Sequence, residues 1–259
     1  MVVNKKSFFF FVNIKNKLYL CRRITDMEAL PNADSVKQFS GGFTPIAFPK
    51  AVSSQTGVSV EYIPDPLGLK RWYVFRASYG RSPKAVDYLI RQGIYVYVPQ
   101  QPKDIVVGHR VKTVLVDLLP NFVFAYLSAN DARRLTMGPA ADEAVSNAAE
   151  AFQVADILSF YYNHSAIDAF GKNPPLTIPD RQMQSFIIAT NTHDHNVMRL
   201  DGQPYTFKSD DEVEVIAGKF KGVCGKVIRA GRQQRILIEL AGFMTFATAY
   251  VPTDFIRKL

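Results

Sequence analysis

Two histidines in the sequence are placed where they could share a metal ion. His193 and His195 flank Asp194, and residues two apart in an extended segment lie on one face, so both imidazoles could reach one ion. A zinc site needs further ligands, and no cysteine, third histidine or acidic cluster obviously supplies them. We therefore interpret this stretch as a polar surface segment. His109 and His164 likewise have no evident partners for a catalytic triad.

A second candidate is the glycine- and lysine-rich stretch GKFKGVCGKV at 218–227, whose composition suits phosphate binding. It lacks the spacing G-x-x-x-x-G-K-[ST] and does not lead into a helix, so we exclude a nucleotide-binding loop. We interpret Cys224 as a small buried apolar residue. With Cys21 as the only other cysteine, the chain cannot form a disulfide framework or a four-cysteine zinc site. We expect no catalytic residues, no metal and no cofactor, and hence no enzyme.

The charge balance favours a polyanionic partner without showing where it binds. The 259 residues contain 31 Lys and Arg against 23 Asp and Glu, which gives a net charge of +8 and a pI of about 9.4. The positive charge is spread along the chain, with no block of like charges. This distribution argues against a dedicated arm that binds duplex nucleic acid.

The first part of the chain, residues 1–69, is predicted to be a poorly structured leader. The apolar run Phe8–Val12 is too short for a signal peptide, and no stretch approaches the roughly 18–20 apolar residues that span a bilayer. Residues 28–69 are rich in Pro, Gly and Ser, which favours loose structure. Whether Met27 is the true start stays open.

Residues 70–200 carry the pattern of an α+β domain. Aromatic and β-branched runs alternate with apolar residues at helical spacing, which predicts an antiparallel or mixed sheet flanked by helices. The expected strands are 72–77, 94–98, 106–116, 122–127 and 158–162, and the expected helices are 82–93, 131–135 and one that begins at 179–180.

After a linker at 201–207, the pattern changes to strands only. Residues 208–259 contain four short alternating runs, at 212–215, 226–228, 236–240 and 247–251, with glycines at the turns. So few residues cannot form a wide sandwich, but they can close into a small barrel that removes exposed edges.

Three stretches of this sequence resemble the NusG family of transcription elongation factors. WYV at 72–74 and LLPNFVFAYL at 118–127 resemble the NusG N-terminal (NGN) domain, and SDDEVEVIAGKFKGVCGKVIRA at 209–230 resembles an SH3-like KOW barrel. Asn121, in place of the commoner glycine, is similar to the RfaH-like paralogues. The stretch at 160–183 looks like the UpxY group, which is linked to capsular polysaccharide operons of Bacteroides-type bacteria. The resemblance implies a transcription antiterminator in the cytoplasm.

The resemblance also implies which residues bind partners. Family members bind RNA polymerase through an apolar patch, contact the non-template DNA strand with basic residues, and recruit Rho or a small-subunit ribosomal protein through the KOW domain. For several of these residues a structural role is equally open: Trp72, Phe122 and Phe220 could be core, and the basic residues could be a solvated helix end. The matching positions are Trp72, Tyr79, Leu119, Pro120 and Phe122 for polymerase, Arg76, Arg81 and Lys84 for nucleic acid, and Phe220, Lys219 and Lys221 for the KOW partner.

A rival reading is a KOW-type protein that binds RNA or the ribosome without touching polymerase. It would share the barrel and the positive charge but would not need an apolar patch around Leu119. Nascent RNA could be contacted through the basic, glycine-rich loop at 218–226. Under either reading we expect a monomer with no membrane contact. Glycine and β-branched residues favour a stable barrel over refolding into helices.

Overall fold

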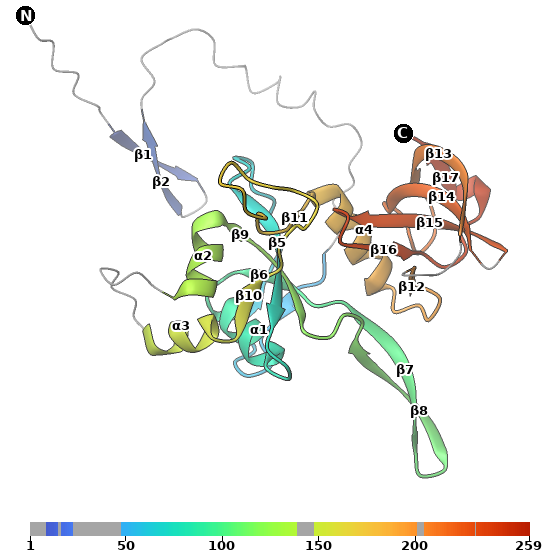
Figure 1. Ribbon diagram of the computed structural model, residues 1–259, viewed down its shortest axis with the longest axis horizontal. Coiled ribbons are helices and arrows are strands. Elements are labelled where there is room, and N and C mark those ends of the chain that lie inside the picture. The colour runs from blue at the N-terminus through green and yellow to red at the C-terminus, as the bar shows by residue number, and fades with distance from the viewer. Residues whose placement is uncertain (1–8, 15–16, 23–47, 139–147, 201–204, 231) are drawn as a thin grey trace, which may run out of the picture. The chain divides into compact units, whose positions relative to one another are not determined.

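The computed structural model divides into two compact units, Met1–Ile46 and Ala47–Leu259 (Figure 1). In the first unit, β1 (Phe9–Ile14) and β2 (Lys17–Arg22) form an antiparallel hairpin, so this part of the expected leader has regular structure. Met27 and the first half of the expected linker lie outside the described residues. The structure describes residues 9–14, 17–22, 48–138, 148–200, 205–230 and 232–259.

The second unit is built on a five-stranded sheet in which every pair is antiparallel. The strand order is β10-β5-β9-β6, and β11 also pairs with β5. The strands β5 and β9 lie in the middle because their aromatic and β-branched side chains are almost all buried. The bounds are β5 Lys70–Ala77, β6 Tyr95–Tyr97, β9 Phe122–Ser128, β10 Leu158–Phe160 and β11 Thr177–Ile178.

Four helices accompany this sheet, which gives the α+β class that the sequence predicts. In α1 (Ser82–Arg91), Pro83 lies in the first turn, where its missing N–H is not needed. The helix α2 (Ala129–Met137) starts at Ser128, whose hydroxyl accepts a hydrogen bond from the Asp131 N–H at 3.2 Å. The other two helices are α3 (Ala148–Ala155) and α4 (Asp180–Asn191).

Residues 48–69, expected to be loose, are instead folded onto the sheet. Two short strands, β3 (Ala51–Val52) and β4 (Ser59–Val60), pair with each other. The ring of Tyr62 lies 5.5 Å from Trp72 and 5.0 Å from Tyr126, and burial raises the pKa of its hydroxyl. The prediction was wrong here because it rested on the Pro and Gly content and did not consider Tyr62. Burial of that aromatic ring offsets the entropy cost of ordering the segment.

A buried carboxylate fastens the same segment to α1. Asp87 accepts hydrogen bonds from the Ser53 hydroxyl, from the Gln55 N–H at 3.4 Å and from the Arg91 Nε at 3.2 Å. Its side chain is only 2% exposed. The hydrogen bond from Ser53 is the main reason that the pKa of Asp87 lies below its usual value.

A long hairpin replaces the single strand expected at 106–116. The strands β7 (Gln100–Val107) and β8 (Arg110–Asp117) pair in antiparallel register around a turn at Gly108, where φ is +63°. The predicted range covers the end of β7 and all but the last residue of β8, but the prediction missed Gly108 as the turn residue. The hairpin projects away from the sheet as an arm (Figure 1).

The C-terminal residues form a six-stranded antiparallel sheet in the order β12-β16-β15-β14-β13-β17. The first three alternating runs fall on strands as expected, whereas the fourth strand lies at 244–247 and not at 247–251. At Gly225 a Cβ atom would lie 1.9 Å from the Leu237 carbonyl oxygen, so only glycine fits there. The bounds are β12 Met198–Arg199, β13 Thr206–Val215, β14 Cys224–Ala230, β15 Gln233–Leu240, β16 Met244–Ala247 and β17 Ile256–Lys258.

The Asp87 contacts predict a pH-dependent stability. We expect Asp87→Asn to lower the melting temperature of the full chain by several degrees at pH 7, because the amide replaces a charged acceptor. Since the folded-state pKa lies below the usual 3.8, this stabilisation is present above that value and is lost as the pH falls through the lower one. The difference in melting temperature between wild type and Asp87→Asn should therefore be constant near neutral pH and become smaller below about pH 4.

The control for this comparison is Asp254→Asn, which neutralises an exposed carboxylate. Thermal melts followed by circular dichroism across the pH range make the comparison. If the melting temperatures of wild type and Asp87→Asn differ by the same amount at every pH, the role given to the carboxylate is contradicted.

Candidate functional site

The turn between β8 and β9 is held against the end of β5. The Ala77 N–H donates to the Asn121 carbonyl oxygen at 2.8 Å, and the Leu118 N–H donates to the Pro99 carbonyl oxygen at 2.8 Å. Asn121 has a φ of +66°, a conformation that asparagine tolerates better than most residues. The hydrogen bond from Ala77 brings the following turn, which contains Tyr79, close to this one.

The five candidate apolar residues divide sharply by exposure. Tyr79 is 93% exposed and Pro120 is exposed, whereas Trp72 and Leu119 are at most 1% exposed and belong to the core. Phe122 is half-buried. The structure therefore brings Tyr79, Pro120 and Phe122 to one end of the sheet and places Trp72 and Leu119 beneath the surface.

Phe122 belongs to an aromatic cluster that the sequence reading missed. Its ring lies 5.7 Å from Tyr161 and 5.2 Å from Phe243, and the last two rings lie 4.6 Å apart. Phe243 comes from the turn between β15 and β16, so the C-terminal sheet covers part of Phe122. The signal that could have found it is an aromatic residue directly after Gly242 in a predicted turn.

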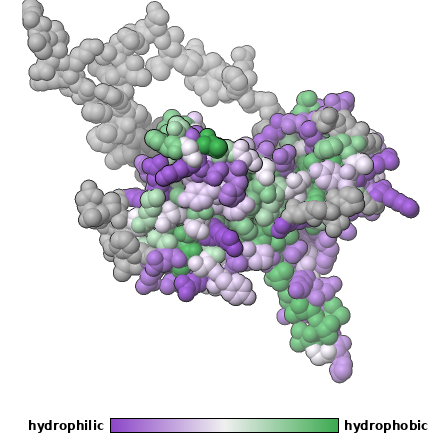
Figure 2. All heavy atoms as spheres, in the orientation of Figure 1, coloured by the Kyte–Doolittle hydropathy of each residue, from purple (hydrophilic) through white to green (hydrophobic). Residues whose placement is uncertain are grey.

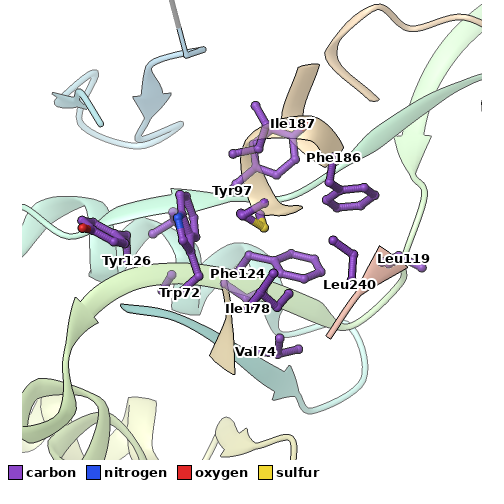
Figure 3. Packing of buried hydrophobic residues seen from close by; sticks show 14 of the residues in the cluster. Trp72, Val74, Tyr97, Leu119, Phe124, Tyr126, Ile178, Phe186, Ile187 and Leu240 are labelled. Atoms are coloured by element: carbon purple, nitrogen blue, oxygen red, sulfur yellow. The ribbon is translucent and has the colours of Figure 1, made fainter. Parts of the chain in front are cut away.

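Helix α4 connects the two sheets through its buried face. Phe186 lies 5.6 Å from Phe124 in the first sheet and 4.7 Å from Phe246 in the second, and Leu240 joins the same cluster (Figure 3). The Ser185 hydroxyl accepts from the Cys224 N–H at 2.9 Å, and the Gln182 Oε1 accepts from the Ala241 N–H at 2.7 Å. The two sheets therefore share one hydrophobic core.

The opposite end of α4 is tied to the first sheet by a buried hydroxyl pair. The Tyr97 and Thr190 hydroxyl oxygens lie 2.6 Å apart, and the Thr190 hydroxyl also lies 2.7 Å from the Phe186 carbonyl oxygen. Burial raises the pKa of Tyr97 to about 12, so its hydroxyl keeps its proton throughout the physiological range.

The candidate cations lie around the same end of the first sheet. Arg76 pairs in register with Phe122 on β9 and Ser159 on β10, so its exposed side chain shares a sheet face with Phe122. Arg81 and Lys84 are exposed at the start of α1, and the Lys84 Nζ donates to the Gln153 Oε1 at 2.9 Å. This surface combines cations with the exposed ring of Tyr79.

The candidate residues of the C-terminal sheet are arranged differently. Phe220 is 3% exposed and belongs to the core, which was one of the two alternatives. Lys219 is exposed and forms an ion pair with Asp194, and Lys221 is exposed. That ion pair also gives Asp194, between the two histidines, a structural partner. No group of three or more side chains suited to holding a metal ion occurs among the described residues.

Residues 70–187 match the family model described as NusG, transcription termination factor nusG. The matched segment runs from the start of β5 into α4 and includes the turn at 118–121, so it contains a NusG-like domain. Over these residues the chain is similar to NusG-family transcription factors. No curated protein matches the chain. None of the helices in the described ranges has both the length and the apolarity that crossing a bilayer requires.

The shared core predicts that one aromatic ring stabilises both sheets. Phe186 is fully buried, so Phe186→Ala should lower the free energy of unfolding by about 3–5 kcal/mol, measured by urea denaturation. The matched control is Phe170→Ala, because Phe170 is 86% exposed and its loss should change stability by less than about 0.5 kcal/mol. Equal effects of the two variants would show that Phe186 does not connect the sheets as described.

Proposed function

We propose that this protein is a transcription elongation and antitermination factor that binds RNA polymerase through residues 70–200 and promotes processive transcription. The observation that carries the proposal is the match of residues 70–187 to the NusG family. Asn121 and the sequence at 160–183 support the finer assignment to the RfaH-like and UpxY group, and with it a role at polysaccharide biosynthesis operons.

The proposed polymerase contact is the end of the sheet that carries Tyr79 and Pro120. Two exposed apolar groups on turns at the same end of the sheet can dock on a partner without unfolding any element. Phe122 extends this surface toward the C-terminal sheet. Leu119 is buried within the same turn as Pro120, so its proposed part is to support that turn from the core, whereas Trp72 is buried toward the other end of β5 and is not part of the proposed contact.

The proposed nucleic-acid contact lies beside it. Arg76, Arg81 and Lys84 are exposed, and such side chains can neutralise the phosphates of an unpaired non-template strand. This arrangement allows one surface to contact both polymerase and the DNA strand that polymerase leaves unpaired.

The C-terminal sheet is proposed to be a KOW domain that recruits a second protein such as Rho or a small-subunit ribosomal protein. The linker expected at 201–207 is shorter at its end, because Thr206 and Phe207 already belong to β13. The proposed contact is the exposed loop with Lys219 and Lys221, and Phe220 supports that loop from the core. Because the sheet also packs on α4, its proposed partner reaches it from the side that α4 leaves open.

The test is retention of the full chain on the core RNA polymerase of its host bacterium, after nuclease treatment and at moderate salt. We expect wild type to be retained and Tyr79→Asp with Pro120→Asp to lose at least about tenfold in affinity, because a charge would be buried at the contact. Both side chains are exposed, so the double variant should keep its melting temperature.

The matched control is Tyr250→Asp, which changes a tyrosine that is 55% exposed elsewhere on the chain. Its retention should equal that of wild type. Absence of retention for wild type, together with binding to ribosomal particles or RNA that needs Lys219 and Lys221, would favour the rival RNA- or ribosome-binding function and reject the proposal.

A further inference from the structure

The β7–β8 hairpin is an arm whose surface no part of the proposed function uses. Eight residues in each strand give it a length of about 25 Å. Figure 2 shows hydrophobic and hydrophilic surface side by side along it. Val106, Val107 and Val111 near its tip are each at least 60% exposed. An exposed arm of this kind points to a binding partner.

The pairing register separates the charges of the hairpin onto opposite faces. Residues that pair across an antiparallel ladder share a face, and successive residues alternate between faces. One face holds the pairs Lys103–Val114, Ile105–Lys112 and Val107–Arg110, and the other holds Gln100–Asp117, Pro102–Leu115, Asp104–Thr113 and Val106–Val111. All three cations of β7 and β8 therefore lie on one face, and both carboxylates lie on the other.

The carboxylates are unable to neutralise these cations from the far side. Asp104 instead accepts a hydrogen bond from the Thr113 hydroxyl at 2.6 Å, on its own face. Lys103, Arg110 and Lys112 are exposed, and none of them forms an ion pair with any carboxylate in the described part of the chain. The cationic face thus keeps a full charge of three, next to aliphatic side chains.

The spacing of the three cations suits a nucleic-acid backbone. Each successive pair on the face carries one cation, and such pairs repeat every two residues, or about 7 Å. Phosphates along one strand of B-DNA advance by 3.4 Å each, so the cations can meet about every second phosphate. A two-stranded β-ribbon is also narrow enough to enter the major groove of a duplex, which is about 12 Å wide.

We infer that the β7–β8 hairpin binds duplex DNA, with its cationic face directed at the phosphate backbone. The proposed site is separate from Arg76, Arg81 and Lys84. The hairpin leaves the sheet at Gln100 and Asp117, and its three cations lie beyond these residues on the projecting arm (Figure 1). The overall charge distribution argues against such an arm, since the hairpin as a whole carries both signs. That argument does not hold for the folded hairpin, because the pairing register places its positive residues on one face and its negative residues on the other.

The test measures binding of the full chain to a duplex of about 30 base pairs by fluorescence anisotropy, from about 50 to 200 mM salt, without polymerase. In the hairpin variant, Lys103, Arg110 and Lys112 are each changed to Gln. Loss of three phosphate contacts should reduce the slope of log K against log salt by about 2.7. Affinity at the lowest salt should fall at least about tenfold.

The matched control changes Lys50, Lys172 and Lys258 to Gln, which lowers the net charge equally and affects exposed side chains. Its slope should stay close to that of wild type. Equal losses in the two triple variants, or no binding of wild type to the duplex, would overturn the inference. Normal duplex binding by the hairpin variant combined with loss of polymerase retention would overturn it in favour of a protein partner.

The inference and the proposed function fail separately. Duplex binding is measured without polymerase, whereas the Tyr79 and Pro120 variants are measured by retention on polymerase. Asp104→Asn with Asp117→Asn, on the opposite face, should leave the salt slope unchanged, and a large change there would contradict the assignment of the cationic face.

Discussion

The packing of α4 between the two sheets is the constraint on which the second compact unit depends. A helix that buries Phe186 against Phe124 on one side and Phe246 on the other cannot be removed without exposing both cores. The backbone N–H groups of Cys224 and Ala241 find their acceptors on the same helix. The C-terminal sheet therefore has a defined position against α4, and its β15–β16 turn places Phe243 in contact with Phe122.

That packing determines which side chains are left for partners. Trp72, Leu119 and Phe220 resemble interface residues in type, yet each is buried where it supports a strand or turn. The accessible side chains include Tyr79 with Pro120, the cations at the start of α1, and the faces of the β7–β8 arm. The proposed function and the inferred DNA contact thus use separate surfaces on one scaffold.

Much of the sheet could be predicted from the sequence because local pattern and burial agree there. The run from Trp72 to Ala77 and that from Phe122 to Leu127 consist mostly of aromatic and β-branched residues, and both are central strands. Pattern alone did not place the turn at Gly108, since β-branched residues that suit a strand lie on both sides of it. It also could not show that Tyr62 packs on Trp72, because contacts between distant segments leave no local signal.

The candidate site was predictable only in part, for the same reason. Residue type identified Tyr79 and Arg76, which are exposed, but it could not separate them from Trp72, which is buried. Phe243 was missed because its contact with Phe122 depends on how the C-terminal sheet packs against α4. The spread of charge along the chain gave no sign of a cationic face on the hairpin, since only the pairing register shows that Lys103, Arg110 and Lys112 share a face.

The central claim is that the end of the sheet at Tyr79 and Pro120 is the surface that docks on polymerase. Hydrogen–deuterium exchange of the full chain, alone and bound to its host's core RNA polymerase, tests it most directly. We expect slower exchange on binding in the turns at 78–81 and 118–122. Protection confined to 205–259, with those two turns unchanged, would contradict the claim.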